Sequence, residues 1–112
     1  MNILSNEAVD SALTIDSAKN GTAVEVNAKG APQTVAFVVT ASAASSPTGT
    51  TIQLAASLDN TNWILLGSTV SVTGNGSFTV SDDRPKYKYY RIAYARSSGS
   101  YVANTQACVK GN

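Results

Sequence analysis

Apolar and polar residues alternate with a period of two along most of this chain, and this pattern limits the fold more than any other feature. The clearest example is the segment 51–58, where Ile52, Leu54, Ala56 and Leu58 share one parity. From residue 22 onward, no segment keeps apolar residues at helical spacing over three turns. Because successive side chains of a strand point to opposite faces, the alternation predicts half-buried β-strands and an all-β domain.

Turn-forming residues divide this pattern into short segments. The expected strands, separated by segments rich in Gly, Pro, Asn, Asp and Ser, are residues 22–27, 33–42, 51–58, 63–67, 69–73, 77–81, 86–96 and 101–110. Residues 59–62 and 74–76 are predicted to close two hairpins, and residues 43–49 to form a loop of small side chains. About seven or eight strands with frequent turn signals are typical of a sandwich or a small barrel, and we expect an antiparallel β-sandwich.

The chain of 112 residues is expected to form one domain, because two halves would each be too small to bury a core. We assign residues 21–112 to the sandwich. Residues 1–20 are expected to form an N-terminal arm or the first strand, and their apolar residues would also fit a short helix. Within this segment the first seven residues are predicted to be unpaired.

The absence of His and the presence of a single Cys, Cys108, exclude most catalytic chemistry. Ser-His-Asp and Cys-His catalysis, His-ligated zinc and Cys-x-x-Cys chemistry all need residues that are missing. Cys108 is predicted to be a small buried hydrophobe. Asp82-Asp83 and residues 59–62 are interpreted as polar turns rather than calcium sites, because they lack enough carboxylates at calcium-binding spacing. We therefore expect no enzyme activity and no cofactor.

Five bases lie between Arg84 and Arg96, interleaved with tyrosines. Such a pattern is found in proteins that bind single-stranded nucleic acid. The isoelectric point of about 7.8 is below the value above 9 that is usual for those domains, so we predict a half-buried strand with solvated cations and no nucleic-acid partner.

No segment of the sequence predicts a signal peptide or a membrane span. Residues 1–7 have no basic region followed by an apolar one, and no apolar run approaches the ~20 residues of a transmembrane helix. We expect a chain that is made in the cytoplasm of a cell and does not contact a membrane.

Two segments carry a resemblance to a known class of protein. They are Ala56-Ser57-Leu58-Asp59-Asn60-Thr61-Asn62-Trp63-Ile64-Leu65-Leu66-Gly67 and Tyr89-Tyr90-Arg91-Ile92-Ala93-Tyr94. They resemble small virion proteins of tailed bacteriophages, in which a Ser-Leu-Asp-Gly-Thr-Asn-Trp strand end and a later Tyr-x-Arg-Val/Ile strand mark a jelly-roll-like sandwich. The resemblance covers roughly residues 50–95 and departs from the pattern at Asn60, where Gly is commoner.

The resemblance implies a structural protein, and the Ser-, Thr- and Ala-rich composition suits contact with other proteins. We expect a capsid cement (decoration) protein on the capsid surface of the virion, bridging major capsid subunits as a homo-oligomer, either a trimer or a dimer. The expected partner-binding residues, from the N-terminal segment and the charged strand, are Ile3, Leu4, Val9, Lys86, Lys88, Arg91 and Arg96.

Two alternatives share the sandwich. The chain could be a tail, neck or fibre component, which would be present in few copies per virion. It could also be a carbohydrate-binding module in which Trp63 stacks on a sugar, although Trp63 shares parity with Leu65 after a turn and is more simply interpreted as buried.

Overall fold

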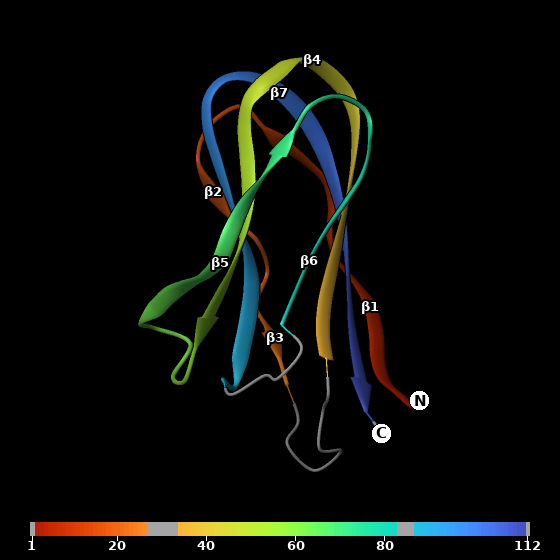
Figure 1. The fold of residues 1–112 in the computed structure, drawn as a ribbon, viewed down its shortest axis with the longest axis vertical. Coiled ribbons are helices and arrows are strands. Elements are labelled where there is room, and N and C mark those ends of the chain that lie inside the picture. Colours follow the sequence, from red (N-terminus) through yellow and green to blue (C-terminus); the bar gives the residue numbers. More distant parts are fainter. Residues whose placement is uncertain (1, 27–33, 83–86, 112) are drawn as a thin grey trace.

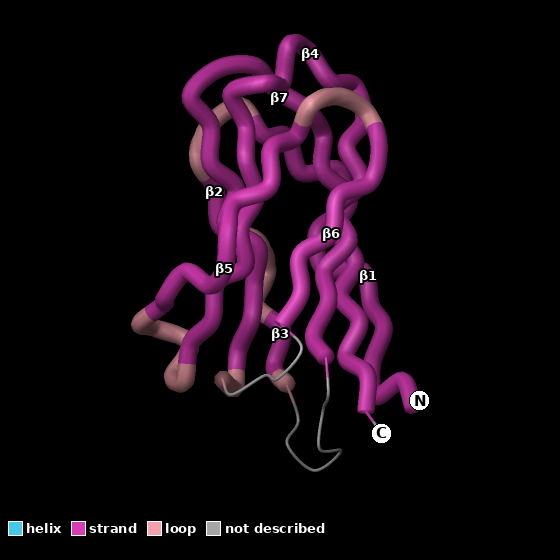
Figure 2. Tube along the Cα trace, viewed as in Figure 1, coloured by secondary structure: helices cyan, strands magenta, loops and turns pink. Residues whose placement is uncertain are grey.

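The computed structural model describes residues 2–26, 34–82 and 87–111, with the backbone alone for residues 2–7, 47–48 and 109–111. The strands are β1 (Asn2–Ile15), β2 (Lys19–Asn20), β3 (Val24–Glu25), β4 (Thr34–Ser57), β5 (Trp63–Val72), β6 (Gly76–Asp82) and β7 (Tyr89–Gly111). The strands run along the long axis of a molecule that measures 42 × 28 × 21 Å (Figure 1). No helix occurs in the described part of the chain (Figure 2).

Two long strands, β4 and β7, each pass through both layers of a sandwich. β4 bends at residues 43–49 and β7 at residues 97–99, and the pairing between them shifts register at these bends. Ala43 and Gly99 have positive φ values of 51° and 79°, which turn the chain sharply. The hydroxyl of Ser97 donates a hydrogen bond of 3.1 Å to the carbonyl of Gly49, so the two bends are tied to each other.

Each layer contains one half of β4 and one half of β7. Layer 1 has the order β1, residues 101–111 of β7, residues 34–42 of β4, and β6. Layer 2 has β2 and β3 at one edge, then residues 89–96 of β7, residues 50–57 of β4, and β5. All pairs are antiparallel, and this order is that of a jelly roll. The predicted jelly-roll-like β-sandwich is confirmed.

The second predicted hairpin is wrong. Residues 69–73 belong to β5, which pairs with β4 in layer 2, whereas β6 pairs with β4 in layer 1. The turn at residues 74–76 therefore carries the chain from one layer to the other. The side-chain oxygen of Asn75 accepts a hydrogen bond of 3.0 Å from the amide of Ala44, which joins this turn to the bend of β4. That bend was expected to be a loop, but it continues the pairing with β7.

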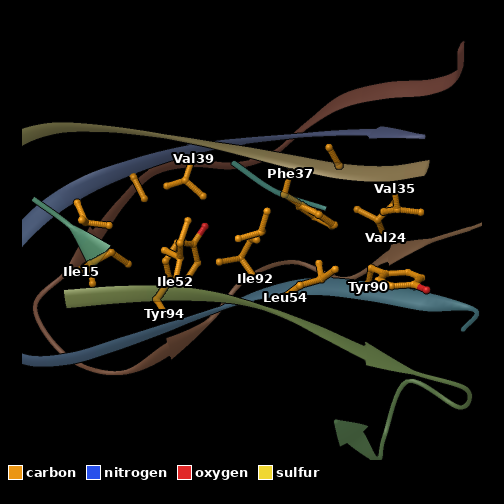
Figure 3. Packing of buried hydrophobic residues seen from close by; sticks show 14 of the residues in the cluster. Ile15, Val24, Val35, Phe37, Val39, Ile52, Leu54, Tyr90, Ile92 and Tyr94 are labelled. Carbon is orange, nitrogen blue, oxygen red and sulfur yellow. The ribbon is translucent and has the colours of Figure 1, made fainter. Parts of the chain in front are cut away.

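The core lies between the two layers, as the alternation predicts. Layer 1 contributes Val35, Phe37 and Val39, and layer 2 contributes side chains that face them (Figure 3). The buried residues of layer 2 from the central strands are Ile52, Leu54, Ala56, Tyr90, Ile92 and Tyr94. Cys108 was expected to be buried, but it is only half-buried, because it lies on the opposite parity from buried Ala107.

Residues 2–15 form an edge strand rather than an unpaired arm. Their backbone pairs with β7 from Asn2, opposite Gly111, to Ile15, opposite Tyr101. The carboxylate of Asp10 ties this strand to the rest of the sandwich, because it accepts hydrogen bonds from the hydroxyl of Tyr94 at 2.7 Å and from the amide of Thr22 at 3.0 Å. The expectation of an unpaired N-terminus is therefore corrected.

Candidate interaction surface

The tight turn between β4 and β5 is organised by the carboxylate of Asp59. One of its oxygens accepts hydrogen bonds from the amides of Asn62 and Thr61, at 2.8 and 2.9 Å, and from the hydroxyl of Ser57 at 2.9 Å. These bonds, chiefly that from the Asn62 amide, hold the pKa of Asp59 far below its ordinary value. The carboxylate is thus engaged in shaping the turn.

Asn60 occupies the position where the resembling proteins commonly have Gly. Its φ of 61° lies in the left-handed region, which Gly adopts without strain and Asn tolerates better than most residues. The left-handed backbone at this position therefore explains why Gly is common there and why Asn is acceptable in this chain. The turn also fixes the positions of Leu58 and Trp63 on either side of it.

Three large apolar side chains lie exposed around this turn, and we call them the apolar edge: Leu58, Ile64 and Leu65. Their exposed fractions are 67%, 45% and 61%. Ile64 pairs with buried Ala56 and so belongs to the inner face of β5, whereas Leu65 pairs with Ala55 and belongs to the outer face. Apolar side chains therefore project on both sides of β5, which is the outermost strand of layer 2.

A cavity of about 190 Å³ lies beside the apolar edge. Its wall is formed by Ala56, Ser57, Leu58, Asp59, Asn62, Ile64 and Tyr87. Tyr87 is held by an edge-to-face contact with Tyr90, whose ring centre is 6.3 Å away. The hydroxyl of Tyr90 in turn donates to the Asp82 carboxylate at 2.9 Å. The end of layer 2 thus offers a concave apolar surface next to protruding apolar groups.

The outer face of layer 2 carries a stacked cation and ring. The guanidinium of Arg91 lies 3.9 Å from the centre of the Trp63 ring. Ala55 and Ser57 of β4 also point to this outer face, because they pair with Leu65 and Trp63. Both side chains are buried although they do not face the core. Removal from water lowers the pKa of Arg91, although an arginine remains charged at neutral pH. We call Trp63, Tyr89 and Arg91 the outer platform.

Trp63 is half-buried, and the guanidinium covers one face of its ring. Trp63 was predicted to be buried, and the structure buries only part of its side chain. A sugar that stacks on an aromatic side chain needs an open ring face, so the covered face cannot serve as a carbohydrate platform unless Arg91 moves away.

The predicted partner-binding residues do not form one cluster. Val9 is half-buried against the core, and Lys88 is exposed, 3.7 Å from the Glu25 carboxylate and 5.5 Å from the Tyr89 ring centre. Arg91 belongs to the outer platform, and Arg96 donates from Nε to the carbonyl of Gly99 at 2.7 Å. The side chains of Ile3 and Leu4 and the whole of Lys86 lie outside the described residues.

The apolar edge was not among the residues expected to bind a partner. The sequence does carry a signal for it, because Trp63, Ile64, Leu65 and Leu66 form a run of four large apolar residues that breaks the alternation. Such a run in a strand with one solvated face leaves some of its members exposed.

The sequence matches no known protein family and no characterised protein. Within the described ranges, no three His, Cys, Asp or Glu side chains are grouped closely enough to hold a metal ion. The same ranges contain no helix long and apolar enough to cross a membrane.

Proposed function

We propose that this chain is a structural protein of a bacteriophage virion, and specifically a cement protein that binds major capsid subunits on the capsid surface. Binding to other proteins is its role in this proposal, with no catalysed reaction. The observation that carries the proposal is the outer platform, which is built from both segments that resemble virion proteins.

The two resembling segments are neighbours in space. Ser57 in β4 pairs with Trp63 in β5 on one side and with Tyr89 in β7 on the other. Arg91 then stacks on Trp63 across the same face. The residues of the two resembling segments thus make one continuous surface over three adjacent strands, which supports a shared binding role better than two separate resemblances would.

The outer platform has the composition of a protein-binding surface. Trp, Tyr and Arg are the residues most enriched at the energetic centres of interfaces. Because the guanidinium is already stacked and partly removed from water, a partner would meet an ordered surface with little side-chain entropy left to lose. Repeated over a capsid lattice, many such contacts add up to cohesion that a single subunit contact lacks.

The proposal is tested by counting copies of this chain in virions of the phage whose genome encodes it. Quantitative mass spectrometry against the major capsid protein should give a ratio near one or a simple fraction of it. A handful of copies would assign the chain to the neck, tail or fibre, and its absence from purified virions would refute a structural role.

A second experiment tests whether the outer platform determines the number of copies bound to the virion. Tyr89→Ala removes one ring of the outer platform, and Thr79→Ala changes an exposed residue of β6 in the other layer. Virions assembled with Tyr89→Ala should carry fewer copies, while Thr79→Ala should leave occupancy unchanged. Equal occupancy by both variants would exclude the outer platform as the capsid contact.

A further inference from the structure

The guanidinium of Arg91 lies across the outer face of β4, in a position that its neighbours in the sheet determine. Arg91 of β7 pairs with Ala55 of β4. Trp63 of β5 pairs with Ser57 of the same strand β4. Because β4 lies between β5 and β7, the contact between the guanidinium and the Trp63 ring crosses its outer face. This crossing accounts for the burial of Ala55 and Ser57, which point to that face.

The nitrogen atoms of this guanidinium differ in their access to solvent. Nε of Arg91 is shielded from solvent and has no hydrogen-bond partner among the described residues, whereas the terminal nitrogens Nη1 and Nη2 are not shielded in this way. By contrast, Arg96 of the same strand donates from its Nε to the carbonyl of Gly99 at 2.7 Å. Arg91 therefore presents a partly desolvated group whose terminal N–H donors are engaged by no described residue.

The charge of Arg91 is also unmatched within the described part of the chain. Lys88, a neighbouring cation, lies 3.7 Å from the Glu25 carboxylate, but no described carboxylate forms an ion pair with Arg91. Burial alone lowers the pKa of Arg91, as expected for a cation that no carboxylate stabilises. The outer platform thus carries a positive charge that an anionic group of a partner would complement.

We propose that the two terminal nitrogens of Arg91 bind the carboxylate of an aspartate or glutamate side chain of the protein that the outer platform contacts. This inference rests on the proposed function, because it names the group that the partner protein supplies. A planar guanidinium donates two parallel N–H bonds to the two oxygens of a carboxylate, and such bidentate pairs are stronger than neutral hydrogen bonds. The contact with the Trp63 ring already holds the guanidinium in place, so little side-chain freedom is left to lose on binding.

A phosphate group could also accept two bonds from Arg91, but the surroundings favour a single carboxylate. A nucleic acid needs open ring faces for its bases and several cations for its phosphates. Here Arg91 covers one face of Trp63, and the ammonium of Lys88 lies 5.5 Å from the centre of the Tyr89 ring. Lys88 is in addition paired with Glu25. Arg91 is then the cation that the outer platform offers to an incoming anion, which matches an acidic side chain.

The test measures the binding of two matched peptides to the purified chain, so it does not depend on virions. Acetyl-Gly-Glu-Gly-amide carries a carboxylate, and acetyl-Gly-Gln-Gly-amide replaces it with a neutral amide of the same shape. Proton–nitrogen NMR follows the Nε–H signal of each arginine, assigned through its bonds to the backbone. The glutamate peptide should shift the Arg91 signal saturably, with a dissociation constant at least about tenfold lower than at Arg96, whose Nε is already bonded. The glutamine peptide should leave the Arg91 signal in place.

A variant tests whether the stacked ring builds the site. Trp63→Leu leaves Arg91 without its ring and should weaken the binding of the glutamate peptide about threefold or more. If this variant does not fold, the comparison of Arg91 with Arg96 in the unaltered chain decides. Equal shifts at the two arginines, equal effects of the two peptides, or tighter binding of single-stranded hexathymidylate at Arg91 would overturn the inference.

The virion occupancy of Tyr89→Ala separates a failure of this inference from a failure of the proposed function. Fewer copies of Tyr89→Ala on virions, without peptide binding at Arg91, would support the capsid role and overturn the carboxylate site. Peptide binding at Arg91 by a chain that is absent from virions would support the carboxylate site and refute the capsid role.

Discussion

Two buried tyrosines of β7 should respond in opposite ways to the loss of one hydroxyl group. The hydroxyl of Tyr94 donates to Asp10 at 2.7 Å and lies 2.5 Å from the hydroxyl of Thr105. The hydroxyl of Tyr101 is buried and has no hydrogen-bond partner among the described residues. Burial raises the pKa of both, that of Tyr101 to about 12. The change to Phe removes the same atom at both sites.

The expected change in the free energy of unfolding depends on which hydrogen bonds each substitution removes. Tyr94→Phe removes a charge-assisted bond to Asp10, worth about 1.5–3 kcal/mol, and a neutral bond to Thr105, worth about 1 kcal/mol. We expect a loss of about 2–4 kcal/mol in the free energy of unfolding. Tyr101→Phe removes a desolvated hydroxyl that gains nothing in the folded state, so we expect a change between zero and a gain of about 1 kcal/mol.

Urea unfolding followed by far-ultraviolet circular dichroism measures both free energies. At roughly 5 °C per kcal/mol for a domain of this size, Tyr94→Phe should also lower the melting temperature by about 10–20 °C. The reasoning is refuted if the two variants lose equal stability or if Tyr101→Phe is the more destabilising. As an internal check, Tyr94→Phe should cost less in a chain that already carries Thr105→Val, because the two hydroxyls share one bond.

Three further predictions concern the bends, the outer platform and the turn. Gly49→Ala should cost about 1–3 kcal/mol in chemical denaturation, because its β-carbon would meet the backbone of the opposite bend at 2.6 Å, whereas Gly74→Ala meets nothing within 4 Å and should not destabilise comparably. Arg91→Ala should shift the fluorescence of Trp63, the single tryptophan, to longer wavelength and increase its quenching by acrylamide; unchanged spectra would contradict the stacking. Since the pKa of Asp59 is lowered in the folded state, its stabilising contribution is present above pH 4 or so and is lost as the pH falls further. Asp59→Asn should therefore flatten the loss of stability between about pH 4 and pH 2 in acid titrations of unfolding, and an unaltered slope would argue against that contribution.

Alternation was sufficient to predict the core and the fold class. The parities of Phe37, Leu54 and Ile92 were each assigned correctly, because a strand must place every second side chain on the buried side. The pairing of the strands could not be predicted in this way, because a period of two contains no information about which strand lies alongside another. Gly74-Asn75-Gly76 has the composition of a hairpin turn, yet here it connects two layers, and only the long-range pairing with β4 decides between these outcomes.

The candidate surface was predictable only in part. Arg91 was selected from the cluster of basic residues, but its stacking on Trp63 depends on β4 lying between their strands. Leu58 has the parity of a core residue and is nonetheless exposed, because it lies beyond the end of β4. Alternation does not mark where a strand ends, so the exposure of Leu58 could not be predicted from it, whereas the apolar run from Trp63 to Leu66 does signal exposed residues.

The central position of β7 has a consequence for how the chain is made. β7 is the pairing partner of β1, β2, β3 and both halves of β4, and it follows all of them in the sequence. While residues 89–111 are still inside the ribosome, β4 can pair only with β5 and β6, and the apolar residues of β1 have no sheet to join. Such non-local pairing is slow and leaves strand edges open in the meantime. A nascent chain from which β7 has not yet emerged is therefore expected to be prone to aggregation.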